Sequence, residues 1–298
     1  MSMALKELKN RIKAADNIKQ ITRAMKLIAS VKIKKIQRAF LPFKEYFKNL
    51  QEIVSVLLSN TDFKLSLKDL DILKQKEGNK IGLVVITSDK GLCGAFNTNI
   101  FNYFEKNYIN LRDNLVIVAV GKKAVSYFNT RKYNLFATFD KVGDIPSFEF
   151  IKKLRDQVFD LYKNVSKVEV IYARYYSASK FIPVSVKLLP FDINLVDIKR
   201  DDKVTLDNVD HFIFEPFLED IGQEIFEIYV SSLIYQLILE SKLSEFSARL
   251  MAMNTATDNA ENLIKDLKLL FFKKRQEAIT KELLEIVAGV EALSLIHI

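Results

Sequence analysis

Hydrophobic residues near the N-terminus recur at steps of three and four, which predicts a helix over residues 4–37. The apolar face is a narrow seam like that of a coiled coil, and not the broad stripe of a helix on a globular core. Pro42 interrupts the pattern, so we expect a second helix over 43–59 and a polar connection over 60–80. The predicted seam consists of Leu5, Leu8, Ile12, Ala15, Ile18, Thr22, Met25 and Ile28.

The same spacing returns near the C-terminus and continues much longer, from Pro216 to about Ala292. This run contains no internal proline, and no glycine between Gly222 and Gly289. At about 1.5 Å per residue, such a helix is on the order of 100 Å long. A helix of this length needs a partner to cover its seam, and we expect it to pair antiparallel with the N-terminal helix.

The middle of the chain changes character, because short runs rich in β-branched residues alternate with helical stretches. This alternation is typical of a mainly parallel sheet with helices on its faces. Strands are expected over 81–87, 115–121 and 167–172, helices over 99–106, 122–128 and 148–163, and an added edge strand over 181–189.

These patterns predict an α/β fold combined with an all-α coiled coil. Long antiparallel N- and C-terminal helices would flank an inserted Rossmann-like α/β domain. The expected divisions are an N-terminal helical part (1–60), a connection (61–80), the α/β domain (81–210) and the long C-terminal helix (211–298).

Composition argues against several kinds of site. The 298 residues include only 8 glycines and 5 prolines, so few loops are expected. His211 and His297 are the only histidines, so we expect no catalytic triad, no metal and no cofactor. The lone Cys93 cannot form an intrachain disulfide. No apolar run approaches the roughly 20 residues of a membrane span, and the charged N-terminus is unlike a signal peptide.

The positive charge is concentrated in the first helix. Residues 1–38 contain eleven Lys or Arg and two acidic residues, a net +9, whereas the whole chain carries +8 and the remainder therefore −1. Such a localised excess indicates an anionic partner. Nucleic acid is one alternative, although no aromatic residue interleaves these charges; the solvated face of a coiled coil is another.

The segment Thr87 to Gly94 follows a predicted strand and contains two glycines and a lysine. It has neither the Gly-x-Gly-x-x-Gly pattern nor the Gly-Lys-Ser/Thr of a phosphate-binding loop. We therefore interpret it as a strand-to-helix turn with Gly91 and Gly94 at its tight positions. Cys93 within it has no second cysteine with which to form a redox switch.

Five segments stand out by sequence: 18–30 with Ile-Thr-Arg-Ala-Met, 86–97 with Thr-Ser-Asp-Lys-Gly-Leu-Cys-Gly, Phe214-Glu-Pro216, 248–260 and 275–289. In this order they resemble the gamma subunit family of F-type ATP synthases, the F1 sector central stalk, over nearly the whole chain. The chain departs from that family at Ala248 and Val290, at Phe212 and Phe214 in place of tyrosines, and in a C-terminal extension over 294–298.

The resemblance implies a non-catalytic rotor shaft that couples ion-driven c-ring rotation to conformational changes at the catalytic sites of the α3β3 ring. It implies the alpha, beta and epsilon subunits and the c-ring as partners, without nucleic acid or direct membrane insertion. The location it implies is peripheral, on the cytoplasmic side of the bacterial membrane. Contacts with the catalytic ring would involve Met25, Arg249, Arg275, Gln276, Thr280 and Glu282, and contacts with the c-ring or epsilon Phe212, Phe214 and Glu215.

Each of these residues also has a plainer interpretation. Polar residues on a coiled coil are commonly its solvated face, and the two phenylalanines could pack into the α/β domain. Two alternative functions remain open at this point: the gamma-like shaft of a specialised F1-type motor, or a free-standing α/β nucleotide binder with helical extensions.

Overall fold

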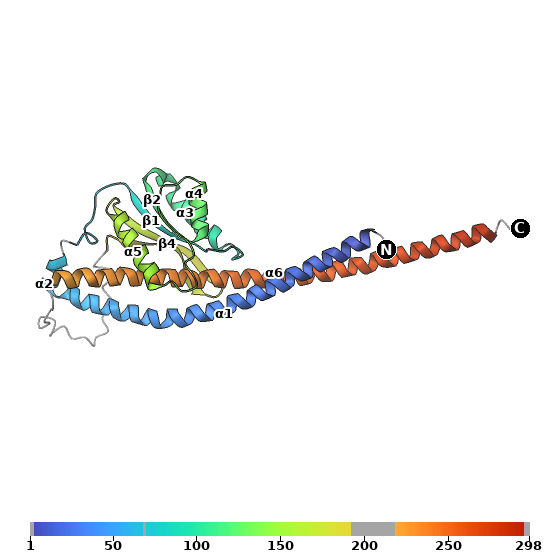
Figure 1. Ribbon diagram of the computed structural model, residues 1–298, viewed down its shortest axis with the longest axis horizontal. Coiled ribbons are helices and arrows are strands. Elements are labelled where there is room, and N and C mark those ends of the chain that lie inside the picture. Colours follow the sequence, from blue (N-terminus) through green and yellow to red (C-terminus); the bar gives the residue numbers. More distant parts are fainter. Residues whose placement is uncertain (1–2, 68–69, 192–217, 295–298) are drawn as a thin grey trace. The chain divides into compact units, whose positions relative to one another are not determined.

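A computed structural model describes residues 3–67, 70–191 and 218–294 of the chain. Two long helices, one at each end of the sequence, flank an α/β domain (Figure 1). The helices are α1 (Met3–Ser59), α2 (Thr61–Ser66), α3 (Phe96–Tyr108), α4 (Lys122–Thr130), α5 (Phe148–Tyr162) and α6 (Leu218–Ser294), with a 3-10 turn at Ile109–Asn114. The strands are β1 (Ile81–Ile86), β2 (Leu115–Val120), β3 (Leu135–Phe139), β4 (Lys167–Ser177) and β5 (Lys180–Leu189).

The N-terminal helix is continuous through Pro42, so the predicted break into two helices is wrong. Proline removes the hydrogen bond that its N–H would donate to the carbonyl four residues earlier, here that of Arg38. Both Pro42 and Arg38 are exposed, so water can solvate the freed carbonyl. Buried residues on either side, Ile36 and Phe47, hold the helix in place across the proline.

The five strands form one sheet in the order β3-β2-β1-β4-β5. The pairs β1–β2, β1–β4 and β2–β3 are parallel, and β5 runs antiparallel to β4 at one edge. The predicted parallel sheet and its added edge strand are thus confirmed, whereas β3, at the opposite edge, was not predicted. All six residues of β1 are buried, as expected for a central strand covered on both faces.

Alternate residues of β1 face two separate hydrophobic layers. Leu83 and Val85 belong to the layer under α3 and α4, and Val84 and Ile86 to the layer under α5 and α6 (Figure 1). The domain is therefore a three-layer α/β/α sandwich in which a stretch of α6 supplies one of the covering helices.

The described chain divides into two compact units, residues 29–249 and residues 1–28 with 250–298. Within the first, α1 and α6 run antiparallel, because residue numbers fall on one helix as they rise on the other. The Gln51 amide donates to the Tyr229 hydroxyl at 3.2 Å, and the Lys32 ammonium lies 5.1 Å from the centre of the Phe246 ring. The segment predicted as a polar connection contributes α2 here, whose first turn is capped by the Asn60 side chain.

Within the second unit the same antiparallel pairing holds. The Thr257 hydroxyl donates to the Thr22 hydroxyl at 2.9 Å, and Ala15 and Ala260 are buried in the seam. Ile18 and Ile28 were predicted in this seam but are 54% and 55% exposed. The heptad spacing accounts for the difference. Strictly alternating steps of four and three carry the seam through Ala15, Thr22 and Ala29. The predicted series contains two extra steps of three, from Ala15 to Ile18 and from Met25 to Ile28, and each placed an isoleucine one position before the seam.

Candidate functional site

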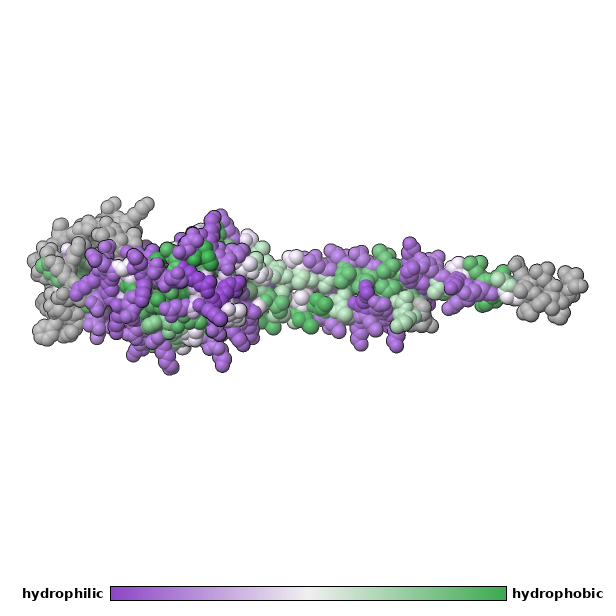
Figure 2. Space-filling model, turned by 90° about the horizontal axis from the view of Figure 1, so that it is seen from above, coloured by the Kyte–Doolittle hydropathy of each residue, from purple (hydrophilic) through white to green (hydrophobic). Residues whose placement is uncertain are grey.

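Within the second unit, no described helix of this chain pairs with the end of α6. Met3 begins α1, and by the antiparallel register it lies near residue 276 of α6. Beyond that point hydrophobic and hydrophilic residues alternate along a single exposed helix (Figure 2). Exposed apolar side chains over this stretch are Ile279, Leu283, Leu284, Ile286, Val287 and Val290. Ile279, Leu283, Val287 and Val290 are three or four residues apart, so they lie on one side of the helix, and exposed apolar residues grouped in this way mark an interaction site.

The polar residues predicted to contact a catalytic ring lie on the same part of α6. Arg275, Gln276, Thr280 and Glu282 are all exposed there. Met25, on α1, is half-buried beside the seam. The four side chains of α6 are therefore accessible to another molecule, and a guanidinium such as that of Arg275 can donate two hydrogen bonds to a carboxylate.

Arg249 is placed differently from the other predicted contact residues, because only 6% of it is exposed. Its guanidinium donates to the Glu245 carboxylate at 2.8 Å and to the carbonyls of Lys90 and Gly91 at 3.2 and 3.3 Å. The forked donors of Arg249 are thus already used inside the chain.

Most basic residues of the first helix are exposed, including Lys6, Lys9, Lys13 and Arg23. Several others pair locally, as Arg11 does with Glu7 at 2.6 Å. Exposed apolar residues lie among these charges, notably Ile18, Ile21, Leu27 and Ile28. This face of α1 therefore combines positive charge with exposed apolar area.

The loop after β1 is organised by the carboxylate of Asp89. One oxygen of its carboxylate accepts from the backbone N–H groups of Lys122 and Lys141, both at 3.1 Å, and the other from that of Val142 at 3.0 Å. Asp89 thereby ties together the segments that follow β1, β2 and β3. Parallel α/β sheets commonly bind ligands outside the carboxyl ends of their strands, and here an internal carboxylate occupies part of that edge.

The tight positions of this loop are only partly those predicted. Gly94 has a φ of +56°, as a tight turn requires, but Gly91 does not adopt a positive φ. Leu92 takes the left-handed conformation instead, with φ +61°. Cys93 is buried, and its sulfur accepts from the Asn97 amide at 3.2 Å, so it acts as a packing and hydrogen-bonding residue.

Three charged residues of α6 face this loop. Lys242, Glu245 and Arg249 are spaced to lie on one side of the helix. Lys242 lies 3.2 Å from Glu245 and 3.8 Å from Asp89, and the side chains of Lys242 and Glu245 are 6% and 5% exposed. Asp89, Lys242 and Glu245 were not among the site residues predicted from the sequence. The available signal was the helical spacing of three charged residues, at positions 242, 245 and 249 of α6.

An open groove of about 500 Å³ lies beside α5 and is lined in part by charged residues. Three of its acidic residues form ion pairs: Asp156 and Glu227 with Arg155, and Asp160 with Lys163. Burial raises the pKa of Tyr162 to about 12, so this phenol remains protonated at neutral pH. These residues line the groove without forming an acid–base pair.

Among the described residues, no group of three or more His, Cys, Asp or Glu is placed to hold a metal ion. Likewise, none of the helices in the described part of the chain is long and apolar enough to span a membrane. Phe212, Phe214 and Glu215, predicted to contact a c-ring or epsilon subunit, lie outside the described residues.

Fold and surface together define a class of protein: a long antiparallel helix pair, carrying an α/β domain, whose exposed faces are built for contact with other proteins. Comparison with known sequences identifies the family. The profile of the family described as ATP synthase matches residues 4–293. The ATP synthase gamma chain of Heliobacterium modesticaldum is 35% identical over 293 residues, covering 97% of this chain and 99% of that one. That of Amoebophilus asiaticus is also 35% identical, over 304 residues and the same shares of each chain.

This chain belongs to the ATP synthase gamma chain family, and its role is that of the central rotor shaft. Solved structures agree in fold. A chain of the Euglena gracilis mitochondrial ATP synthase superposes with a TM-score of 0.67 at 18% identity, covering 97% of this chain and 94% of that one. A chain of the Tetrahymena thermophila central stalk and c-ring structure gives 0.62 at 24% identity, covering 79% and 99%.

Proposed function

We propose that this shaft couples rotation of a c-ring to conformational changes at the catalytic sites of an α3β3 ring. The observation that carries the proposal is the unpartnered end of α6, where apolar and polar side chains are exposed beyond the start of α1. Such a surface needs a covering partner. The Euglena gracilis relative comes from a structure that contains F1 and the c-ring, which suggests the same partners for this chain.

The helix pair is not three-fold symmetric, so the three catalytic sites of the ring would each meet a different face of it. Contacts that differ between conformations shift the equilibrium among them, and rotation of the shaft passes this bias from one site to the next. Bond making and breaking in ATP belong to the ring, and this chain supplies no catalytic group.

At the ring, the proposed contact residues are Met25, Arg275, Gln276, Thr280 and Glu282. The exposed lysines and arginines of α1 would add weak, screened attraction to acidic ring surfaces, which lets the shaft bind and still turn. At the other contact zone we propose Phe212, Phe214 and Glu215 for the c-ring and the epsilon subunit. The chain would thus be held at the membrane through its complex, on the cytoplasmic side, with either proton or sodium as the coupling ion.

Truncation tests the proposal. Deleting residues 273–298 from the reconstituted synthase should lower ATP-driven ion pumping while the α/β domain stays folded, because these residues contribute nothing to the sheet. In the full-length chain, Arg275→Ala should reduce pumping more than Lys273→Ala, a neighbouring exposed basic residue. Unchanged ion pumping by the truncated enzyme would overturn the proposal.

A further inference from the structure

We propose that Asp89, Lys242, Glu245 and Arg249 form a joint that fixes the angular position of α6 against the α/β domain and carries torque between them. The inference rests on the proposed rotor function and adds where, within this chain, the load passes. All four residues lie in the unit formed by residues 29–249.

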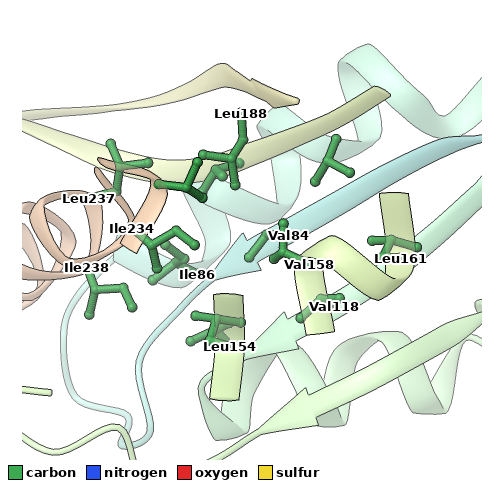
Figure 3. Packing of buried hydrophobic residues seen from close by; sticks show 14 of the residues in the cluster. Val84, Ile86, Val118, Leu154, Val158, Leu161, Leu188, Ile234, Leu237 and Ile238 are labelled. Carbon is green, nitrogen blue, oxygen red and sulfur yellow. The ribbon is translucent and has the colours of Figure 1, made fainter. Parts of the chain in front are cut away.

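The hydrophobic contact between α6 and the sheet does not by itself fix that angle. Ile234, Leu237 and Ile238 of α6 pack near Ile86 and Leu188 of the sheet (Figure 3). Apolar burial is non-directional, so a helix face of similar side chains gains almost as much after a small rotation or slip. A shaft that transmits torque needs contacts that depend on direction as well as on area.

The charged cluster supplies such contacts. Glu245 accepts from Arg249 at 2.8 Å through one oxygen and from Lys242 at 3.2 Å through the other, so its carboxylate is held from both sides. The cluster contains two basic and two acidic side chains, so its formal net charge is zero. Both bonds lie within α6 and turn with it, so their role is to hold Lys242 and Arg249 in the orientation in which they contact the α/β domain. Rotation of the helix would move Lys242 away from Asp89 and Arg249 away from the carbonyls of the loop after β1, which leaves nearly buried charges without those partners in a water-poor environment.

The cluster also contacts the α/β domain, at the loop that follows β1. Arg249 binds the carbonyls of Lys90 and Gly91, and Lys242 faces Asp89. Asp89 in turn is bonded to the segments that follow β2 and β3. A force on α6 is therefore passed to the carboxyl ends of three strands at once. In this domain α6 stands where the fold would otherwise offer room for a ligand.

The test is made in the reconstituted synthase with Glu245→Gln, which keeps the shape and removes the central charge. A probe on the α/β domain reports the angular fluctuation of the rotor while the catalytic ring is stalled. We expect the angular variance to rise at least about twofold, because Lys242 and Arg249 lose their shared partner. ATP hydrolysis without an ion gradient should stay near the wild-type rate, while pumping against a gradient falls.

Glu149→Gln is the matched control, since Glu149 forms an exposed ion pair with Lys153 on α5 at 2.7 Å and should leave the variance unchanged. If Glu245→Gln fails to fold, the double variant Asp89→Asn with Lys242→Met serves instead, because it removes one charge of each sign. Unchanged variance in a folded cluster variant would overturn the joint. If the cluster variant has no effect but the truncation of residues 273–298 still lowers pumping, the joint is refuted and the proposed rotor function stands. If neither the cluster variant nor the truncation has an effect, the joint and the rotor function are both refuted.

Discussion

Replacing Pro42 by alanine tests whether α1 is a single helix. Proline inside a helix is about 3 kcal/mol less favourable than alanine. Alanine restores an N–H that can donate to the Arg38 carbonyl, and the site is exposed, so no packing is lost. Part of this gain is lost because alanine gives the unfolded chain more conformational entropy than proline does, which lowers the free energy of unfolding by about 0.4–1 kcal/mol. We therefore expect Pro42→Ala to raise the free energy of unfolding by about 2 kcal/mol.

Urea unfolding of the isolated chain, followed by circular dichroism at the helix band, measures this change. With an m-value of about 3 kcal/mol/M, the midpoint should rise by roughly 0.7 M. Leu41→Ala is the control, because Leu41 is the exposed neighbour, 65% accessible, and should change stability by less than about 0.5 kcal/mol. A midpoint for Pro42→Ala that equals or falls below wild type would refute a continuous hydrogen-bonded helix and support two helices that meet at the proline.

Further predictions concern two glycines and a half-buried glutamate, all three within α6. Gly222→Ala would place a methyl group 2.5 Å from the buried Leu67 side chain. The cost of overpacking should exceed the gain in helix propensity, so the free energy of unfolding measured in urea should fall by about 1 kcal/mol. Gly289→Ala meets no atom within 4 Å and should instead slow amide hydrogen exchange at the end of α6 by about fivefold; equal effects from both changes would contradict this reasoning. Burial raises the pKa of Glu240 above its ordinary 4.5, despite hydrogen bonds from Tyr172 and the Tyr175 N–H and the nearby Arg174 and Lys44. The folded state then holds this proton more tightly than the unfolded state, so stability is lost as the pH rises from about 4.5 through the folded pKa. Glu240→Gln should flatten that dependence in urea midpoints measured across the pH range, and identical pH profiles would count against it.

The helices and the central strands were predictable because their residues carry a local period. The run before Phe271 has no internal proline and keeps its three-and-four spacing, and the β-branched runs at β1, β2 and β4 are bounded by helical stretches. Strand β3 was missed, since it is a five-residue edge strand that only partly buries its side chains and has one described neighbour, β2.

Some properties of the candidate site residues could likewise be predicted from the sequence, whereas others required the structure. Exposure of Arg275, Gln276, Thr280 and Glu282 follows from their position on a polar-rich end of the helix, and the family motifs drew attention to them. Arg249 belongs to one of the same motifs, yet only its packing shows that its donors are engaged inside the chain.

By itself, the sequence determined the type of the main elements and the family, because periodicity and motifs are local properties. The unusual length of the C-terminal helical pattern also indicated that it pairs with the N-terminal helix. The tertiary structure decided what depends on partners far apart in the chain. Pro42 is tolerated because the flanking turns of α1 are packed, and Ile18 is exposed because the seam follows heptad geometry. Asp89 and Lys242, 153 positions apart in the sequence, face each other only once α6 lies against the sheet. Their interaction depends on distance in space, which no local pattern encodes.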